Sequence, residues 1–208
     1  MKLFLYILIL LTTVSCSTPQ ALLRKGDLVF QVAETSGMSG AIAEATAWND
    51  SLKFDHVGII IKEKKRWIVI EASPKQGVVL TDWKDFLAHA VKIKGKPCVV
   101  VKRITTNFPL KKVIEQAKRH IGEEYDWTFL PDNGKIYCSE LVYECYRDSM
   151  NRPLFTAHPM NFRNANGDMP EFWITLFEQQ GLPIPQGVPG TNPNDMAKEP
   201  ILKEVGRF

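Results

Sequence analysis

Apolar residues fall in short, nearly uninterrupted runs through the first half of the chain. The runs at residues 54–61, 67–72 and 77–80 are each separated by a few polar residues. Runs of this length, rich in Val and Ile, predict strands that are buried on both faces. Their short connections predict an antiparallel meander. Residues 26–31 and 97–103 predict two further strands.

Helical signals lie between and after these runs. Helices are expected at the Ala-rich residues 41–48, after a cap at Thr81 or Asp82, and from an Asn107 cap to about His120. The meander and these helices together predict a domain that combines β-strands and α-helices.

The last quarter of the chain has a different character. After Met150 it is rich in Pro, Asn and Gly, which predicts a C-terminal extension with little regular structure. Residues 172–177 are expected to form a short helix or a buried turn, and residues 181–200 an extended surface tail. The chain has 208 residues, enough for one domain with a sizeable core.

The segment at residues 134–142 predicts a turn that runs into a helix starting at Cys138. One helical face, with a period of 3.6 residues, is formed by Cys138, Leu141, Val142, Cys145 and Ser149. The free N–H groups and partial positive charge of a helix N-terminus stabilise a thiolate and can bind an oxyanion. Cys138 is therefore a candidate nucleophile, and a buried core cysteine is the alternative.

The first fifteen residues combine a charged start at Lys2, a short apolar run and small residues. This pattern predicts a secretory signal peptide at residues 1–15. The apolar run is too short to span a bilayer comfortably. A single domain is then expected at residues 25–208.

The end of this leader, Val14-Ser15-Cys16, resembles the lipobox of bacterial lipoproteins, although Thr13 stands where Leu is usual. The resemblance implies that Cys16 is lipidated and that residues 16–24 form a tether. Because Ser17 rather than Asp follows Cys16, it also implies the outer membrane, with the domain on the periplasmic side. A plain signal peptide cut nearby is the alternative.

Composition argues against two kinds of partner. The formal net charge is only +3, and no dense stripe of Lys and Arg with interleaved aromatics is present, so we expect no nucleic acid. The cysteines have neither CxxC nor zinc-ligand spacing, so we expect no metal, and the chemistry below requires no cofactor. If Cys16 is lipidated, three cysteines remain, so at least one thiol is free. Cys98 and Cys145 are expected to be unreactive.

His56 and Glu71 are the candidate partners of the nucleophile. His56 lies near the start of one apolar run and Glu71 near the end of the next, and the charged residues 62–66 between the runs predict a solvated hairpin turn. The two lie at similar distances from that turn, so we expect them opposite each other on one face. A carboxylate beside an imidazole fixes its tautomer, and a thiolate, a His and a carboxylate form a minimal nucleophilic set.

Other residues compete for these roles. Asp55 is an alternative carboxylate, but strand alternation points it away from His56. His89 and His120 are rival bases near helix ends, where a cation is favourable in any case. His158, in the Pro- and Asn-rich region, is a third. Either proposed partner could also be a structural residue at a strand end.

Four motifs in order resemble one enzyme family: GDLVFQ at 26–31, DHVGI at 55–59, IEA at 70–72 and YCSELV at 137–142. They are similar to the circularly permuted branch of the NlpC/P60 papain-like superfamily, and more closely to the YiiX/YaeF-type amidases. The resemblance covers about residues 25–150. It implies an α+β fold of the papain-like kind, in which a small antiparallel sheet packs against helices. It also implies Cys138 as nucleophile, His56 as base and Glu71 as the orienting carboxylate. Tyr137 matches an aromatic position near the oxyanion.

The resemblance implies a cysteine hydrolase of the cell envelope that cleaves an amide bond in a peptide or N-acyl compound. Fragments of peptidoglycan are one substrate class. A lipid-directed thiol acyltransferase or esterase is an alternative, because the aromatic residues at 125–130 could line a groove for acyl chains. A non-catalytic module that binds peptidoglycan or lipid is another.

Overall fold

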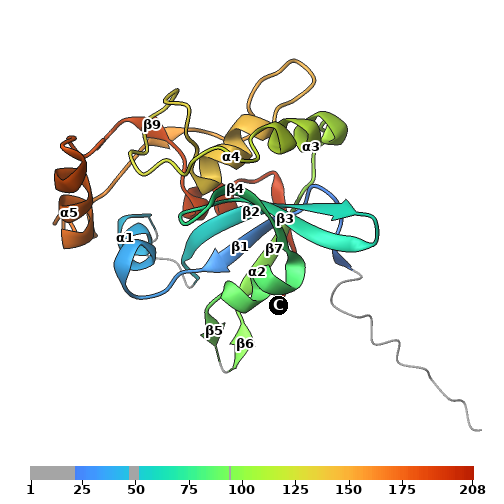
Figure 1. Cartoon of the computed structure of the whole chain (residues 1–208), viewed down its shortest axis with the longest axis horizontal. Helices are drawn as coiled ribbons and strands as arrows, with labels where there is room; N and C mark the ends of the chain where they lie inside the picture. The colour runs from blue at the N-terminus through green and yellow to red at the C-terminus, as the bar shows by residue number, and fades with distance from the viewer. Residues whose placement is uncertain (1–21, 47–51, 94) are drawn as a thin grey trace, which may run out of the picture.

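The computed structural model describes residues 22–46, 52–93 and 95–208, so the predicted signal peptide, Cys16 and most of the tether lie outside it. At its centre is a six-stranded antiparallel sheet in the order β10-β7-β1-β2-β3-β4 (Figure 1). Its strands are β1 (Leu28–Val32), β2 (Phe54–Glu63), β3 (Arg66–Ser73), β4 (Gly77–Asp82), β7 (Val99–Ile104) and β10 (Leu202–Arg207). The predicted meander is β2-β3-β4.

Both faces of the sheet are buried, as the unbroken apolar runs predict. Alternate side chains such as Val57 and Ile59 pack into the main core on one side of the sheet. Ile60 and Val69 point the other way and pack against α2 (Trp83–His89) in a second, smaller core. The Asp82 carboxylate caps α2 by accepting a hydrogen bond from the Lys84 N–H group at 3.0 Å.

Two helices cover the main face of the sheet. α3 (Leu110–Arg119) packs beside α4 (Cys138–Cys145), and α4 contacts β2 and β3. The predicted apolar face of α4 is buried from Cys138 to Cys145, but Ser149 lies beyond the helix. The helix ends because Tyr146 turns to extended backbone and its buried hydroxyl donates to the carbonyl of Gly26 at 3.0 Å.

Two helix starts differ from the sequence prediction. α1 (Gly37–Thr46) begins four residues early, because the Ser39 hydroxyl accepts the Glu34 N–H and draws the expected Gly/Ser loop into the first turn. The predicted residues 47, 48 and 49–51 lie outside the described part. α3 is preceded by Pro109 rather than capped by the Asn107 side chain. A small hairpin, β5 (Lys92–Ile93) and β6 (Lys96–Pro97), precedes β7.

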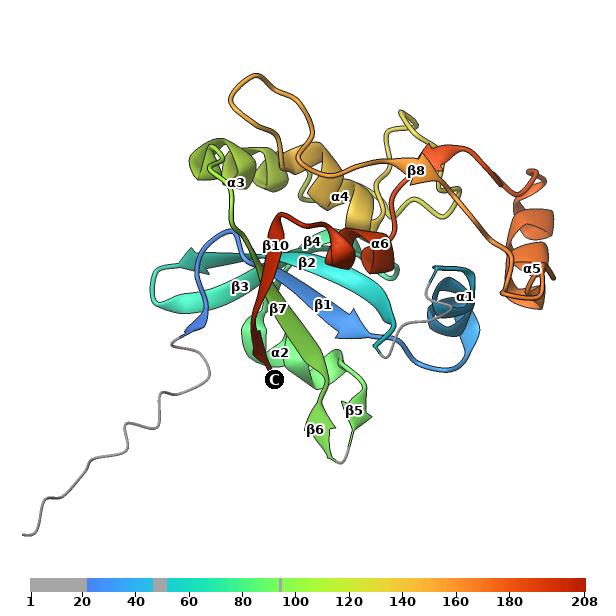
Figure 2. The same ribbon diagram turned by 180° about the vertical axis from the view of Figure 1, so that it is seen from behind.

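The C-terminal region is not the surface tail expected at residues 181–200. It contains α5 (Glu171–Gln180), a short pair β8 (His158–Pro159) and β9 (Pro189–Gly190), and α6 (Pro193–Lys198). α6 packs against β2 and α4, and β10 then joins the central sheet beside β7 (Figure 2). Within the described residues, no helix is both long enough and apolar enough to cross a membrane.

Candidate active site

Cys138 is the first residue of α4 and is 3% exposed. The preceding Tyr137 has extended backbone, and its N–H group donates to the carboxylate of Glu140 at 3.3 Å. Burial raises the pKa of Glu140 to about 8. At neutral pH this carboxyl group is therefore mostly uncharged, so it closes the first turn without placing a full negative charge beside the thiol.

His56 contacts both of its predicted partners. Its Nε2 lies 2.5 Å from Oε2 of Glu71, and the ring lies close enough to the Cys138 side chain for that group to raise the pKa of His56. The bond to Glu71 occupies Nε2, which leaves Nδ1 for the sulfur. Burial alone would lower the pKa of His56, but its bonds to Cys138 and Glu71 raise it well above the ordinary value.

Glu71 is held from its other side by Thr81, whose hydroxyl donates to Oε1 at 2.5 Å. Burial would raise the pKa of Glu71, but the bonds from His56 and Thr81 outweigh it and lower the pKa. The shifts of His56 and Glu71 therefore both favour an imidazolium beside a carboxylate.

The strand register corrects one detail of the predicted geometry. Ile59 pairs with Ile70, so the same register puts Gly58, rather than His56, opposite Glu71. His56 is the diagonal neighbour on the same face. A Cβ on Gly58 would lie 3.5 Å from that of Glu71 and would collide with Val69. The missing side chain leaves room for the imidazole and the carboxylate to meet.

The rival residues lie elsewhere. Asp55 is buried, its Oδ1 has no hydrogen-bond partner, and burial raises its pKa, whereas the carboxylate on His56 is that of Glu71. His120 bonds Glu123 and Gln116 through its two ring nitrogens. His89 ends α2, close enough to Glu71 to contribute slightly to its lowered pKa. His158 is exposed in β8.

The other described cysteines differ in their surroundings. Cys98, Cys138 and Cys145 are all free thiols. Burial raises the pKa of Cys145, which disfavours its thiolate. Cys98 is half-buried and packs against the main core.

A narrow pocket of about 50 Å³ opens beside Cys138. One wall comes from α1 and another from Tyr125 and Phe129 of the aromatic loop. The buried carboxylate of Asp126 shapes this loop by accepting hydrogen bonds from Thr128 and from the Leu130 N–H group. Tyr125 is buried, and burial and the charge on Cys138 raise its pKa well above the ordinary value. The sequence marked this loop as aromatic but did not single out Tyr125.

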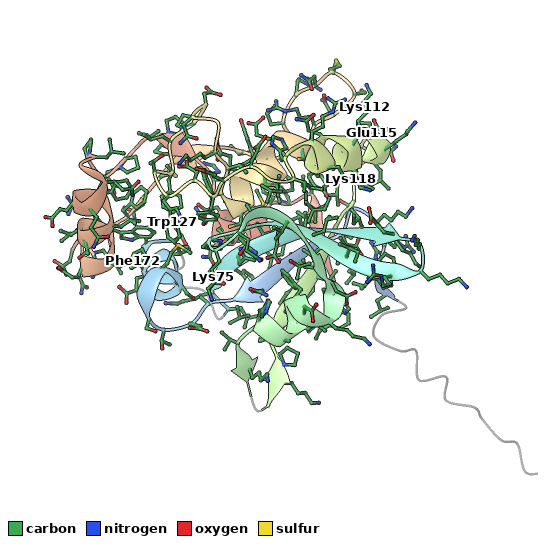
Figure 3. The ribbon with its side chains drawn as sticks, viewed as in Figure 1. Lys75, Lys112, Glu115, Lys118, Trp127 and Phe172 are labelled. Atoms are coloured by element: carbon green, nitrogen blue, oxygen red, sulfur yellow. The ribbon has the colours of Figure 1, made fainter. Side chains whose placement is uncertain are left out.

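The C-terminal region closes the pocket. The Thr191 N–H group donates to the hydroxyl of Tyr137 at 3.1 Å, and the Thr191 hydroxyl donates to Ser139 at 3.1 Å. α5 is joined to the aromatic loop because Gln180 donates to the carbonyl of Trp127, and Figure 3 shows Trp127 and Phe172 at this end of the molecule. Sequence reasoning missed Thr191, because nothing in its neighbourhood signals contact with residues 52 positions away.

This fold and this arrangement define a papain-like cysteine hydrolase in which the His strand precedes the Cys helix. The chain belongs to the family of permuted papain-like amidase enzymes of the YaeF/YiiX type, the C92 family, whose model matches residues 22–206. The match therefore extends past the predicted limit near residue 150. Membership supports a cysteine hydrolase type of activity in general terms.

Two relatives from Escherichia coli are similar over nearly their whole length. The uncharacterized protein YiiX of strain K12 is 29% identical over 210 residues, covering 100% of this chain and 96% of that protein. A crystal structure of YiiX from strain O157:H7 has a TM-score of 0.71 and 26% identity, covering 89% of this chain and 97% of that one. The YiiX protein in that crystal structure is described as a metalloprotein. In the described part of this chain, no three His, Cys, Asp or Glu side chains gather as a metal site.

Proposed function

We propose that this protein is a cysteine amidase or esterase in which Cys138, His56 and Glu71 act together. The observation that carries the proposal is the chain of contacts from Glu71 through His56 to Cys138, at the start of a helix. A pure binding module has no need for a base that contacts both a thiol and a buried carboxylate.

The reaction would proceed in two steps. The Cys138 sulfur attacks the substrate carbonyl, its proton having passed to His56, and the imidazolium then protonates the leaving amine or alcohol. Water, deprotonated by His56, cleaves the acyl-enzyme and releases the acid. Glu71 keeps the ring oriented and stabilises its charged form.

Two groups are candidates to stabilise the oxyanion. The Cys138 N–H group lies in the first turn of α4, where backbone donors have no partner within the helix. The Tyr125 side chain lines the same pocket as Cys138. The Tyr137 hydroxyl accepts a hydrogen bond from Thr191, and the role of Tyr137 at the oxyanion stays a prediction.

The test is formation of an acyl-enzyme. Incubation with p-nitrophenyl acetate should give a burst of nitrophenol, an acetyl mass added to the peptide containing Cys138, and continued turnover. Cys138→Ala should abolish all three. Turnover by Cys138→Ala at the wild-type rate would refute the proposal.

We further propose the cell envelope as the place of action, with a lipid anchor at Cys16 and envelope peptides, peptidoglycan fragments or acyl lipids as substrates. The leader sequence supports this placement. A lipid-directed acyltransferase is the second candidate. The apolar pocket beside Cys138 favours it for short acyl groups, and an acyl product on an added amine or alcohol would distinguish it from the hydrolase.

A further inference from the structure

The pocket beside Cys138 is almost entirely apolar. Its wall combines aliphatic side chains of α1 with a cluster of rings, in which Phe129 and Phe162 meet Trp173 edge-on with centroids 5.6 and 5.1 Å apart. No Lys, Arg, Asp, Glu or His side chain lines it. A charged ligand group would therefore be buried there without a counter-charge, which is costly.

Except for Tyr125, the polar side chains in the wall mostly have partners in the protein. The Thr46 hydroxyl donates to Ile42, and Asn161 donates to the carbonyls of Ala45 and Arg163. Thr191 and Ser139 bond each other, and Asn192 bonds Asp195. Nε1 of Trp173 has no acceptor, but it is shielded and adds no accessible polar atom. Apart from Tyr125 and Cys138, which the proposed reaction uses at the substrate carbonyl, little is left in this wall to recognise a polar group of the ligand.

The position of His56 decides which half of the substrate the pocket receives. The imidazolium must reach the leaving group to protonate it, so the leaving group lies on the His56 side of the carbonyl. His56 is absent from the pocket wall, although Cys138 is part of it. The group on the other side of the carbonyl, the acyl group, therefore points into the pocket.

We infer that this pocket is the acyl site and that it selects a short, uncharged, apolar acyl group. The inference rests on the proposed role of Cys138 as nucleophile. A volume of about 50 Å³ admits several carbon atoms but not a long chain. Ala45 in α1 and Met160 in the C-terminal region both line the pocket and limit its size.

The experiment compares p-nitrophenyl esters of acetate, butyrate, octanoate and succinate. Each methylene buried should raise kcat/KM about fourfold, so butyrate should exceed acetate by about tenfold or more. Octanoate should gain nothing further, and succinate, with the same carbon count as butyrate but a charge, should be poor. A flat series, or succinate equal to butyrate, would overturn the inference.

Three variants locate the effect. Ala45→Leu fills the pocket and should lower the butyrate-to-acetate ratio at least tenfold, whereas Met160→Ala should shift the preference toward octanoate. Glu44→Leu places the same side chain on the exposed side of α1 and should leave the ratio unchanged. Unchanged ratios in both pocket variants would also overturn the inference. If Ala45→Leu does not fold, the preference of Met160→Ala between butyrate and octanoate still tests the inference.

A second probe separates this inference from the proposed function. Alkyl methanethiosulfonates need only a reactive thiol, not a hydrolase. Cys138 should react faster with the butyl than with the sulfonatoethyl reagent, and Ala45→Leu should reduce that preference. If the protein does not turn over esters but Cys138 keeps this preference between the two reagents, the hydrolase proposal is refuted and the pocket inference stands. If the protein turns over esters but prefers neither an acyl group nor an alkyl reagent, the inference about the pocket is refuted and the hydrolase proposal stands.

Discussion

At the scale of single residues, the site depends on which of two carboxylates reaches the imidazole. Glu71 holds His56 and is itself held by Thr81, whereas Asp55, the neighbour of His56 in sequence, leaves one oxygen without a partner. Strand alternation explains this difference, because adjacent residues point to opposite faces.

Glu71→Gln should lower activity by about one to several powers of ten, but less than Cys138→Ala, because an orienting residue contributes less than the nucleophile. Gln keeps the size and a hydrogen-bonding carbonyl but loses the charge that stabilises the imidazolium. The alkylation rate of Cys138 at neutral pH should fall with it.

The matched control is Asp55→Asn, which should leave both the hydrolysis rate and the alkylation rate close to wild type. If Asp55→Asn abolishes thiol reactivity while Glu71→Gln retains it, the carboxylate assignment is wrong.

Glu140 gives a separate pH prediction. Its pKa is raised from 4.5 to about 8 in the folded state, so between these values the fold binds a proton that the unfolded chain has released. The free energy of unfolding should therefore fall as pH rises from about 5 to 8 in the wild type, relative to Glu140→Gln. Urea unfolding of both proteins at several pH values measures this. A constant difference across that range would show that Glu140 is ionised in the fold at acidic pH.

At the scale of elements, α6 holds β2 in place close to His56. Asn194, 1% exposed, accepts the Phe54 N–H and donates to the Phe54 carbonyl, both at 2.7 Å, and also donates to Thr46 at 2.8 Å. Phe54 pairs with Val32 of β1 next to a bulge that shifts the register, and the Asn194 amide braces the strand backbone at this point. Phe54 is two residues before His56, so α6 fixes the base relative to the nucleophile.

Asn194→Ala should destabilise the fold by about 2–3 kcal/mol, because it leaves the polar backbone groups of Phe54 buried without partners. It should also lower kcat more than it raises KM. Urea unfolding and steady-state kinetics measure the two effects. Asn166→Ala, on an exposed turn, should change neither by more than about 0.5 kcal/mol. Equal effects of the two substitutions would mean that Asn194 does not hold β2 in place.

The contrast between α4 and α6 shows what the sequence could predict. The periodic face from Cys138 to Cys145 and the unbroken runs of β2 and β3 are local signals, so the helix, the strands and the pairing of His56 with Glu71 were predictable. The contact of Asn194 with Phe54 spans 140 residues and leaves no periodic pattern in a Pro- and Asn-rich segment. The two-residue offset between His56 and Glu71 depends on the exact hairpin register, which composition alone does not fix.

At the scale of the whole molecule, the predicted leader would place the protein in the cell envelope. Residues 1–21 lie outside the described structure, and the proposal of a lipid anchor rests on Val14-Ser15-Cys16. Cys16→Ala in the full chain should yield a protein without acyl modification, absent from the detergent-extracted membrane fraction. Mass spectrometry and fractionation measure this, with Cys98→Ala as the control that should remain acylated. The same acyl group on Cys16→Ala would refute the anchor.

The contacts of Thr191 and Asn194 also affect the order in which the site can assemble. The ribosome adds Thr191 52 residues after Ser139 and Asn194 140 residues after Phe54, so a growing chain carries its thiol and its imidazole long before the residues that fix their spacing. The reactive pair can therefore form only once nearly all of the chain described here has been synthesised. We therefore expect a fragment that ends before α6 to keep Cys138, His56 and Glu71 but to lack the contacts of Thr191 and Asn194 that brace the segments carrying them.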